Sequence, residues 1–510
     1  MIFKSSILSI LLIGLFIFND LKSQGFIKKF TYPDYVFPKL TSIQKINQDY
    51  WVFGSVTDSI GDEDYLMINK IDSNGVRIFY SIFKNDTIRH WFNNGIVHYN
   101  EKLFTVTNNP YLSASLVSYD LKTDLFKNIV TIKGKDNNNS FFTCNDFTQD
   151  NNGDFIIASA VQLNDITSRY YVQINKITSE GIIKWTYTKL IEGYNIYPTA
   201  ITIQSNNEII IACHRFIDLY DANNSNSMRP LFLHLSNNGN LNSMTLVNKV
   251  MNPINDFLLD EGGNYICAAA DTVHTNRSDY FNSVPVVTSI SSNGNINWLM
   301  DITDRKISYN SFEQMMIIKF DSEKDLYYSS GMGRFINKEG GSYSERNMVV
   351  VSFNNHGDIN WNRRIKNGSG TTNDYCYDLH VHKNEIILVG GSRSYNQQTK
   401  ISEDVGVFIK LNQNGCLLND CLDYKIDSNN FILYVAPNPA QEYLNLFSKE
   451  TKPIDISLFN SYGILLYNSK ATFLEGTTQI PIKGFIPGVY FLSATLQGTN
   501  KKINTKILIY

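Results

Sequence analysis

The sequence predicts an all-β protein: a seven-bladed β-propeller closed by its N-terminal strand, followed by a small C-terminal β-sandwich. Three observations support this: a strand-favouring composition, a repeated unit of strands and turns, and a change of character near Tyr434. The 510 residues include 30 Tyr and 31 Phe, and apolar runs separated by Asn, Ser and Gly favour strands joined by polar turns. The expected segments are a signal peptide (1–23), the propeller (24–421), a linker (422–433) and a C-terminal domain (434–510).

Composition limits the classes of function. The chain is 43% hydrophobic and 18% charged, with a formal net charge of -3. A chain of this length with this apolar content can bury a large core. Basic and acidic residues are interspersed, so there is no basic face of the kind that binds nucleic acid. We therefore expect no nucleic-acid partner.

The first residues have the pattern of a cleavable signal peptide. Lys4 precedes an apolar run from Ile7 to Phe18, and the small residue Ser23 follows a short polar stretch. The run of about 12 residues is too short to cross a bilayer of about 30 Å, which argues against the alternative of an uncleaved anchor. No later apolar stretch approaches the length of a membrane-spanning helix, so we expect no transmembrane segment in the mature chain.

A repeated hairpin organises most of the chain. In each copy an apolar strand ends in an Asn- or Ser-rich turn that contains glycine, and a short strand usually follows. Glycine at a fixed place predicts a turn that needs a positive φ angle. Trp185, Trp298 and Trp361 each follow their glycine at the same spacing, where a large ring would pack between neighbouring sheets. The turn glycines are Gly75, Gly181, Gly239, Gly294, Gly357 and Gly415.

A second unit of two strands lies upstream of each hairpin. A weaker copy near residues 90–132 completes seven four-stranded repeats, whose spacing is typical of propeller blades. The last copy lacks a good fourth strand, whereas Phe26–Tyr32 resembles the outer strand of the other repeats. We therefore expect this N-terminal segment to complete the last blade, which protects two sheet edges. A β-sandwich or two stacked sheets is the alternative.

The six cysteines enter an oxidising compartment if the chain is exported. Cys416 and Cys421 flank a short turn, and we expect a local disulfide between them. A zinc pair is the alternative, but no second pair accompanies it. The other four cysteines lie in predicted strands, as buried thiols or one cross-strand pair.

The C-terminal segment has its own ordered motifs. Ala-Pro-Asn-Pro-Ala at 436–440 is followed by strand patterns around a turn glycine and by a late Gly-Val-Tyr. This order resembles the type A sorting domain of type IX secretion, over about residues 432–510. The resemblance implies recognition by the outer-membrane translocon and delivery of the preceding region to the cell surface or medium. The matching residues are Pro437, Asn438, Pro439, Gly463, Gly488, Val489 and Tyr490.

The sequence gives no catalytic motif. There is no Gly-x-Ser-x-Gly elbow, no His-Glu-x-x-His and no phosphate loop. We predict no cofactor, although the acidic loop of Asp58, Asp62, Glu63 and Asp64 leaves calcium open, because calcium prefers oxygen ligands. Solvated side chains are the simpler interpretation.

The region before the sorting motifs resembles generic secreted bacterial seven-bladed propellers, a scaffold that implies no activity. We expect a binding or adhesion module for a glycan or protein ligand, with an extracellular polysaccharide hydrolase or lyase as the alternative. A purely structural adhesin is a third interpretation. Long insertions at 218–229, 272–283 and 334–346 are the expected place for a ligand.

Overall fold

The computed structural model divides the chain into two compact units, the first ending at Cys421 and the second running from Leu422 to Tyr510. All of the secondary structure described is β-strand, which confirms the all-β prediction for this part of the chain. The structure describes residues 25–509 except 59–62, 85–94, 110–111, 136–138, 165–168, 217–227, 274–281, 303–312, 337–343, 366–370, 383–384, 397–400, 418–433, 437–439, 441, 448–452, 472–476 and 498–501.

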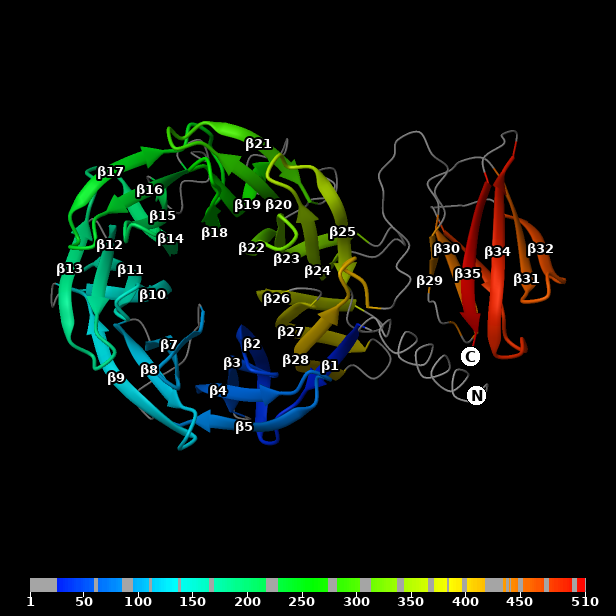
Figure 1. The fold of residues 1–510 in the computed structure, drawn as a ribbon, viewed down its shortest axis with the longest axis horizontal. Helices are drawn as coiled ribbons and strands as arrows, with labels where there is room; N and C mark the ends of the chain where they lie inside the picture. Colours follow the sequence, from blue (N-terminus) through cyan, green and yellow to red (C-terminus); the bar gives the residue numbers. More distant parts are fainter. Residues whose placement is uncertain are drawn as a thin grey trace, which may run out of the picture. The chain divides into compact units, whose positions relative to one another are not determined.

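The first unit is built from repeated four-stranded antiparallel sheets arranged around a common centre (Figure 1). Each sheet follows chain order, with its first strand innermost and its fourth outermost. The first sheet comprises β2 (Tyr35–Ile46), β3 (Asp49–Asp58), β4 (Asp64–Ile71) and β5 (Arg77–Phe83). The second comprises β6 (Val97–Tyr99), β7 (Lys102–Asn109), β8 (Ser113–Asp120) and β9 (Leu125–Lys133).

Three further sheets repeat this design. The third comprises β10 (Asn139–Gln149), β11 (Phe155–Leu163), β12 (Tyr170–Ile177) and β13 (Ile183–Lys189). The fourth comprises β14 (Asn195–Ile203), β15 (Ile209–Phe216), β16 (Arg229–Leu235) and β17 (Leu241–Leu246). The fifth comprises β18 (Ile254–Leu259), β19 (Tyr265–Val273), β20 (Asn282–Ile290) and β21 (Ile296–Asp301).

The remaining strands of the first unit form one eight-stranded sheet with two halves. The halves meet through a single parallel backbone pair between Arg346 and Asn373. One half comprises β22 (Gln314–Asp321), β23 (Leu326–Ile336), β24 (Ser344–Phe353) and β25 (Ile359–Ile365). The other comprises β26 (Thr371–His382), β27 (Glu385–Asn396), β28 (Ile401–Leu411) and β1 (Phe26–Phe30).

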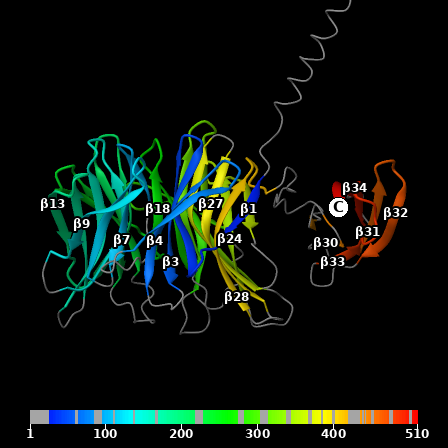
Figure 2. The same ribbon diagram turned by 90° about the horizontal axis from the view of Figure 1, so that it is seen from below.

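The N-terminal strand β1 is paired with the last strand of the unit. It runs antiparallel to β28, with Phe26 opposite Lys410 and Phe30 opposite Gly406. Figure 2 shows the unit from the side, with its strands running between two faces. Chain direction places the starts of the first strands and the connections between second and third strands at one face, and the glycine turns at the other.

The repeated turn has the backbone that its glycine requires. In the first copy of the turn, the N–H of Asp72 donates to the carbonyl of Val76. The side chain of Asp72 accepts hydrogen bonds from the N–H groups of Asn74 and Val76. Gly75 has a φ of 76°, in the left-handed region that residues with a Cβ avoid. The other five predicted turn glycines also have positive φ angles.

Hydrophobic clusters lie between consecutive sheets. One of them joins the first sheet to the last, with Leu40 and Val52 packed against Ile387 and Phe408. Another joins the third and fourth sheets through Ile156, Val172, Ile196 and Ile211. Because these clusters cover both faces of a sheet, its second and third strands are almost entirely buried, as in β7 and β8, whereas an outer strand such as β9 is largely exposed. Cys144, Cys213, Cys267 and Cys376 are buried free thiols in these layers.

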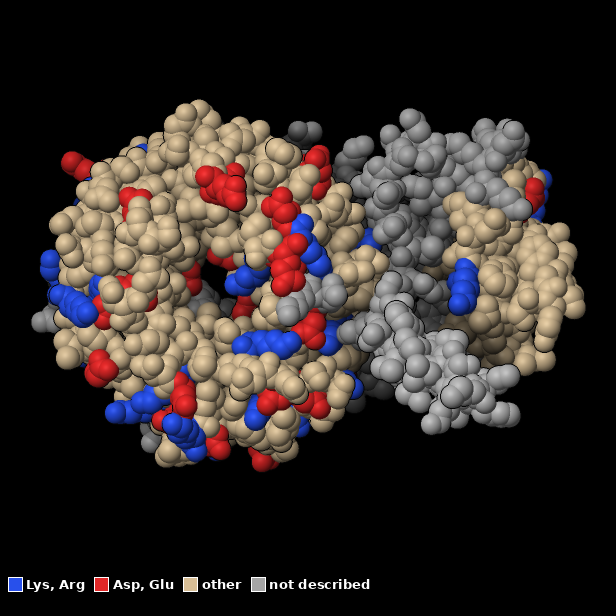
Figure 3. All heavy atoms as spheres, viewed as in Figure 1, with Lys and Arg blue, Asp and Glu red and all other residues tan. Residues whose placement is uncertain are grey.

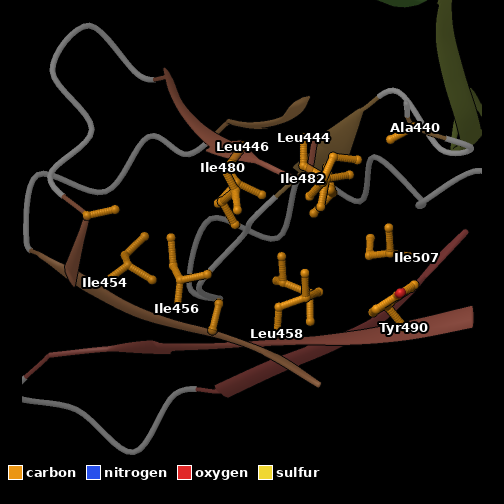
Figure 4. Close-up of a cluster of buried hydrophobic side chains, with 14 of the residues drawn as sticks. Ala440, Leu444, Leu446, Ile454, Ile456, Leu458, Ile480, Ile482, Tyr490 and Ile507 are labelled. Atoms are coloured by element: carbon orange, nitrogen blue, oxygen red, sulfur yellow. The ribbon is translucent and has the colours of Figure 1, made fainter. Parts of the chain in front are cut away.

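The second unit contains two sheets packed around one core (Figure 4). Leu446 and Ile480 of one sheet lie across from Ile456 and Leu458 of the other, all of them buried. The three-stranded sheet comprises β29 (Tyr434–Ala436), β30 (Tyr443–Phe447) and β33 (Thr477–Pro481). The four-stranded sheet has the order β32 (Leu465–Ala471), β31 (Ile454–Asn460), β34 (Gly488–Leu496) and β35 (Lys502–Ile509).

Candidate binding cavity

A cavity of about 860 Å³ lies at the centre of the first unit, bounded by the innermost strands. Residues of β2, β6, β10, β14, β18, β22 and β26 all contribute to its wall. Figure 3 shows the opening at the centre of the ring, with acidic and basic side chains near its margin. A volume of this size is in the range of sites for small ligands, about 300–1,000 Å³.

β-Bulges set the inner surface of this cavity. The pairing between the first and second strands shifts by one residue at matching places in four of the four-stranded sheets and in both halves of the eight-stranded sheet. A bulge adds one unpaired residue and redirects its side chain. The bulged residues all line the cavity: Thr41, Asn145, Thr199, Asn255, Met316 and Tyr377.

An aspartate follows the bulge in three alternate sheets and connects each to the next one. Asp146 accepts the N–H of Phe147 at 2.8 Å with one oxygen and that of Ile201 in the neighbouring sheet at 2.8 Å with the other. Asp256 contacts Ile318 in the same way at 2.9 Å. We call Asp146, Asp256 and Asp378 the inter-sheet aspartates.

The third inter-sheet aspartate connects the last sheet to the first. Asp378 accepts the N–H of Leu379 at 2.7 Å and the N–H of Ile43, on β2, at 2.9 Å. Both oxygens of each inter-sheet aspartate are therefore hydrogen-bonded to backbone. One backbone hydrogen bond on each oxygen fixes the orientation of the carboxyl group and gives it a structural role.

Desolvation dominates the electrostatics of these carboxyl groups. Burial raises the pKa of Asp146 to about 8 and that of Asp256 to about 6, and it also raises the pKa of Asp378. Desolvation opposes the charge of Lys319 as well, but the three carboxylates outweigh it and raise the pKa of the amino group. Lys319 Nζ lies 4.0 Å from an oxygen of Asp378, and the described cavity wall holds one lysine against three aspartates.

Aromatic side chains gather at one end of the cavity. The rings of Phe141 and Tyr170 meet edge to face with centroids 6.0 Å apart, and those of Tyr170 and Tyr197 at 5.8 Å. These three residues come from β10, β12 and β14, so the cluster spans two sheets. It lies at the face that carries the starts of the first strands. We call these three residues the aromatic cluster.

His214, near the end of β15, lies beside the aromatic cluster in the cavity wall. Its side chain is 9% exposed, and its Nε2 has no hydrogen-bond partner among the described residues. Burial lowers the pKa of His214 to about 4, so the imidazole is neutral at physiological pH. A neutral, unsatisfied ring nitrogen can donate to or accept from a ligand, depending on its tautomer.

The site residues predicted from the sequence lie elsewhere. The turn glycines are at the opposite face of the unit. Cys416 is disulfide-bonded, and its expected partner Cys421 lies outside the described residues. Pro437, Asn438 and Pro439 also lie outside them, as does most of each predicted ligand loop.

The acidic loop is only partly described. Asp64 accepts the hydroxyl of Thr57 at 2.5 Å, and Glu63 accepts that of Tyr65 at 2.6 Å. Asp58 accepts the N–H of Glu63, and Asp62 lies outside the described residues. Within the described ranges, no group of three or more His, Cys, Asp or Glu side chains is arranged to hold a metal. The calcium hypothesis for this loop stays a prediction.

In the second unit the predicted motif residues have defined positions. Gly463 has a φ of 79° in the turn after β31, where Asn460 accepts the N–H of Ile464 at 2.9 Å. Gly488 and Val489 begin β34, and Tyr490 is buried, with its hydroxyl donating to the carbonyl of Ile486 at 2.5 Å. These residues shape the turn and the core of the unit.

The cavity itself was missed by sequence reasoning. The tripeptide Asn-Asp-Phe recurs at 145–147 and 255–257, in the first strand of two repeats, and Tyr-Asp-Leu at 377–379 is its counterpart. A search for recurring polar pairs inside the first strands would have found this signal. The aromatic cluster gives no such signal, because its members come from different strands.

Comparisons with known proteins identify the C-terminal unit only. Residues 434–510 match the family model described as a secretion system C-terminal sorting domain. A search of curated proteins finds no match. No helix in the part of the chain that the structure describes is long and apolar enough to cross a membrane.

Solved structures with a similar fold are distant. The β-propeller domain of the Trilobed protease from Pyrococcus furiosus is 11% identical with a TM-score of 0.40, over 78% of this chain and 100% of that one. A europium-containing methanol dehydrogenase is 8% identical with a TM-score of 0.40, over 83% and 85%. A protein of unknown function from Dyadobacter fermentans is 7% identical with a TM-score of 0.42, over 76% and 98%. These similarities assign no activity.

The family match and the motif order agree on the same residues. Export to the cell surface or the extracellular space follows from such a domain. Residues 434–510 are a secretion system C-terminal sorting domain of the type IX pathway, attached to a unit of repeated four-stranded sheets.

Proposed function

We propose that this protein is a binding module exported by type IX secretion, which holds a ligand in the central cavity of its first unit. The observation that carries the proposal is the 860 Å³ cavity, whose wall combines aromatic rings with hydroxyl and amide groups. Apolar surface with a few convergent polar groups is the usual composition of a ligand site. The function needs no cofactor.

The proposal includes a seven-bladed propeller closed by β1. Two contacts support closure: the pairing of β1 with β28, and the hydrophobic cluster between the last and first sheets. The hydrogen bond from Ile43 to Asp378 adds a polar contact at the same boundary. A closed ring keeps the innermost strands at fixed distances, which a preformed cavity requires.

The proposed export route begins with the signal peptide at residues 1–23, passes through the periplasm and ends at the type IX translocon. The sorting domain supports the last step. The signal peptide lies outside the described residues, so its cleavage is part of the proposal. After export, the cavity is available to ligands outside the cell.

The alternative of a polysaccharide hydrolase or lyase has weaker support. Such enzymes use a pair of carboxyl groups as acid and base or nucleophile. In each aspartate of the cavity wall, both oxygens accept hydrogen bonds from backbone N–H groups. One of these bonds comes from the neighbouring sheet and so holds the two sheets together. The pKa values of these aspartates are raised mainly because the carboxyl groups are buried, and a structural carboxyl group would show the same shift.

The test fills the cavity and measures binding and turnover together. Thr202 lines the cavity, so Thr202→Trp should occupy it, whereas Ser243→Trp places the same ring on the exposed outer strand β17. Ligands found by thermal shift on the mature secreted protein should lose binding in Thr202→Trp and keep it in Ser243→Trp. Equal binding by the two variants contradicts the proposal. Product formation, followed by mass spectrometry, identifies an enzyme.

A further inference from the structure

The wall of the central cavity carries more acidic than basic side chains. Its described residues include the three inter-sheet aspartates and, as the single lysine or arginine among them, Lys319. Burial raises the pKa of Asp146, and the charge of Asp256 raises it further. Burial also raises the pKa of Asp256, with a smaller contribution from the charge of Asp378. The carboxyl groups are thus close enough to repel one another, and one ammonium group does not balance three of them.

Each inter-sheet aspartate keeps acceptor capacity beyond its structural hydrogen bonds. The two oxygens of an ionised carboxylate offer about four lone-pair positions. Asp146 uses one position on each oxygen, for the N–H groups of Phe147 and Ile201. The other two aspartates follow the same pattern. A cationic ligand in the cavity would favour the ionised form of all three carboxyl groups and relieve their repulsion.

The spacing of the aspartates suits an extended cation better than a single metal ion. They lie on β10, β18 and β26, which alternate around the ring with other innermost strands (Figure 1). A metal ion needs its oxygen ligands within about 2.0–2.6 Å. Within the described ranges, no group of three or more His, Cys, Asp or Glu side chains is arranged to hold one. A ligand with several ammonium groups can meet carboxylates that stand apart.

His214 is an independent polar group in the wall of the same cavity. Its side chain is 9% exposed, and its Nε2 has no hydrogen-bond partner among the described residues. Burial lowers the pKa of His214 to about 4, so the ring adds no positive charge. With the proton on Nδ1, the Nε2 atom can accept a hydrogen bond from an amino group of a ligand.

The strand register gives the length that a ligand needs to reach both places. His214 lies opposite Tyr197 on β14, and the N–H that Asp146 accepts belongs to Ile201, further along the same strand. At about 3.3 Å per residue, this part of β14 spans roughly 10–13 Å. A short alkylamine would reach one place only, whereas a linear chain with amino groups at intervals could reach both.

We infer that the cavity binds a linear polyamine, with ammonium groups among the inter-sheet aspartates and a further amino group directed to His214. Its N–H groups would donate to carboxylate oxygens and to the imidazole nitrogen, and its methylene groups would meet apolar side chains of the wall such as Ile201 and Phe257. The inference rests on the proposed function, because it names the ligand class for the same cavity.

The experiment measures binding to the mature full-length protein by isothermal calorimetry. The cationic probe is spermidine, and octanediol and suberate are neutral and acidic probes of similar length. The buffer is held slightly above pH 8, so that much of Asp146 is ionised before the ligand binds. We expect saturable binding of spermidine and at least about tenfold weaker binding of the other two probes, because only spermidine is attracted by the carboxylates.

Two variants test the assigned contacts in opposite directions. Lys319→Met removes the ammonium group that competes with the ligand, and should strengthen spermidine binding at least about tenfold. Misfolding would not produce such a gain. Lys127→Met makes the same change at an exposed side chain of β9 and should leave the affinity unchanged. His214→Phe removes the free acceptor and should weaken spermidine binding about tenfold.

Failure of the inference differs from failure of the proposed function. Absence of saturable spermidine binding, or equal affinity for suberate or octanediol, overturns the polyamine assignment. Spermidine affinity that stays the same in Lys319→Met or in His214→Phe also overturns it. If a ligand of another class binds and Thr202→Trp abolishes that binding, the cavity function stands and the polyamine inference alone falls.

Discussion

The indole of Trp185 lies against Gly239, the turn glycine of the next sheet, and donates from Nε1 to the carbonyl of Asn237 at 3.1 Å. A Cβ built on Gly239 would lie 2.9 Å from the indole carbons. Trp298 covers Gly357 in the same way, and Trp361 covers Gly415. Phe26 of β1 takes this place over Gly75, so the N-terminal strand supplies the equivalent ring for the first sheet.

Gly239→Ala should destabilise the protein because the new methyl group meets the indole at a positive φ of 80°. We expect the free energy of unfolding to fall by about 2–4 kcal/mol, because backbone strain and overpacking both contribute. Gly193→Ala is the matched control: its φ is 76°, yet no atom lies within 4 Å of the added Cβ. Urea unfolding of both variants gives the difference due to the ring, and equal losses would show that the indole contact contributes nothing.

Asp378→Asn should weaken the junction between the last and first sheets. An amide keeps one acceptor but points an NH₂ group at a backbone N–H, so a buried donor loses its partner. We expect a loss of about 1–3 kcal/mol in the free energy of unfolding. Asp325→Asn, at an exposed turn with a φ of 52°, should leave stability unchanged or slightly raised. A neutral effect of Asp378→Asn would remove the structural role assigned to this carboxylate.

The free energy of unfolding should depend on pH in the acidic range because of Glu385. Burial opposes its ionisation, but hydrogen bonds from Lys410, Lys45 and Tyr50 prevail and lower its pKa from 4.5 to about 2. A depressed folded-state pKa stabilises the fold above the unfolded-state value, and this contribution is lost as pH falls from 4.5 toward 2. Glu385→Gln should flatten the stability profile in that window, measured by urea unfolding, whereas exposed Glu323→Gln should not. An unchanged slope in Glu385→Gln would contradict the assignment.

Phe26→Ala should loosen the attachment of β1. The ring lies 6.2 Å from that of Phe408, centroid to centroid, and against Gly75. We expect the free energy of unfolding to fall by about 1–3 kcal/mol. The β28 amides that face β1 should exchange their hydrogens faster. Lys29→Ala changes an exposed residue of the same strand and serves as control. Exchange of β28 as slow as in the unchanged protein would show that β1 is held by backbone pairing alone.

Leu458→Asp should block export without unfolding the first unit. Leu458 is fully buried between the two sheets of the sorting domain, and a charge there has no partner. We expect the protein to accumulate in the periplasm, detected by fractionation and immunoblotting. Leu466→Asp makes the same change at a side chain that is 46% exposed, and it should be exported normally. Secretion of Leu458→Asp would mean that the translocon does not read the folded domain.

The sequence predicted the features that recur at fixed spacing. Gly239 and Trp185 were both predicted, and the packing of the ring between sheets followed from the size of the side chain. The inter-sheet aspartates were not predicted, because the bulge that turns Asp146 toward Ile201 depends on the register between β10 and β11. The contact of Tyr170 with Tyr197 joins two repeats, so no periodic signal within one repeat marks it.

The position of β28 between β27 and β1 determines how the first unit would carry mechanical load. Tension applied at the end of that unit enters through β28, which pairs with β27 along its whole length and with β1 over residues 406–410. A force along its axis has to shear hydrogen bonds on both sides, whereas an edge strand is held by the hydrogen bonds of one side alone. If the protein is held at a surface while a ligand pulls on the ring, the last sheet is thus suited to transmit the force without unravelling.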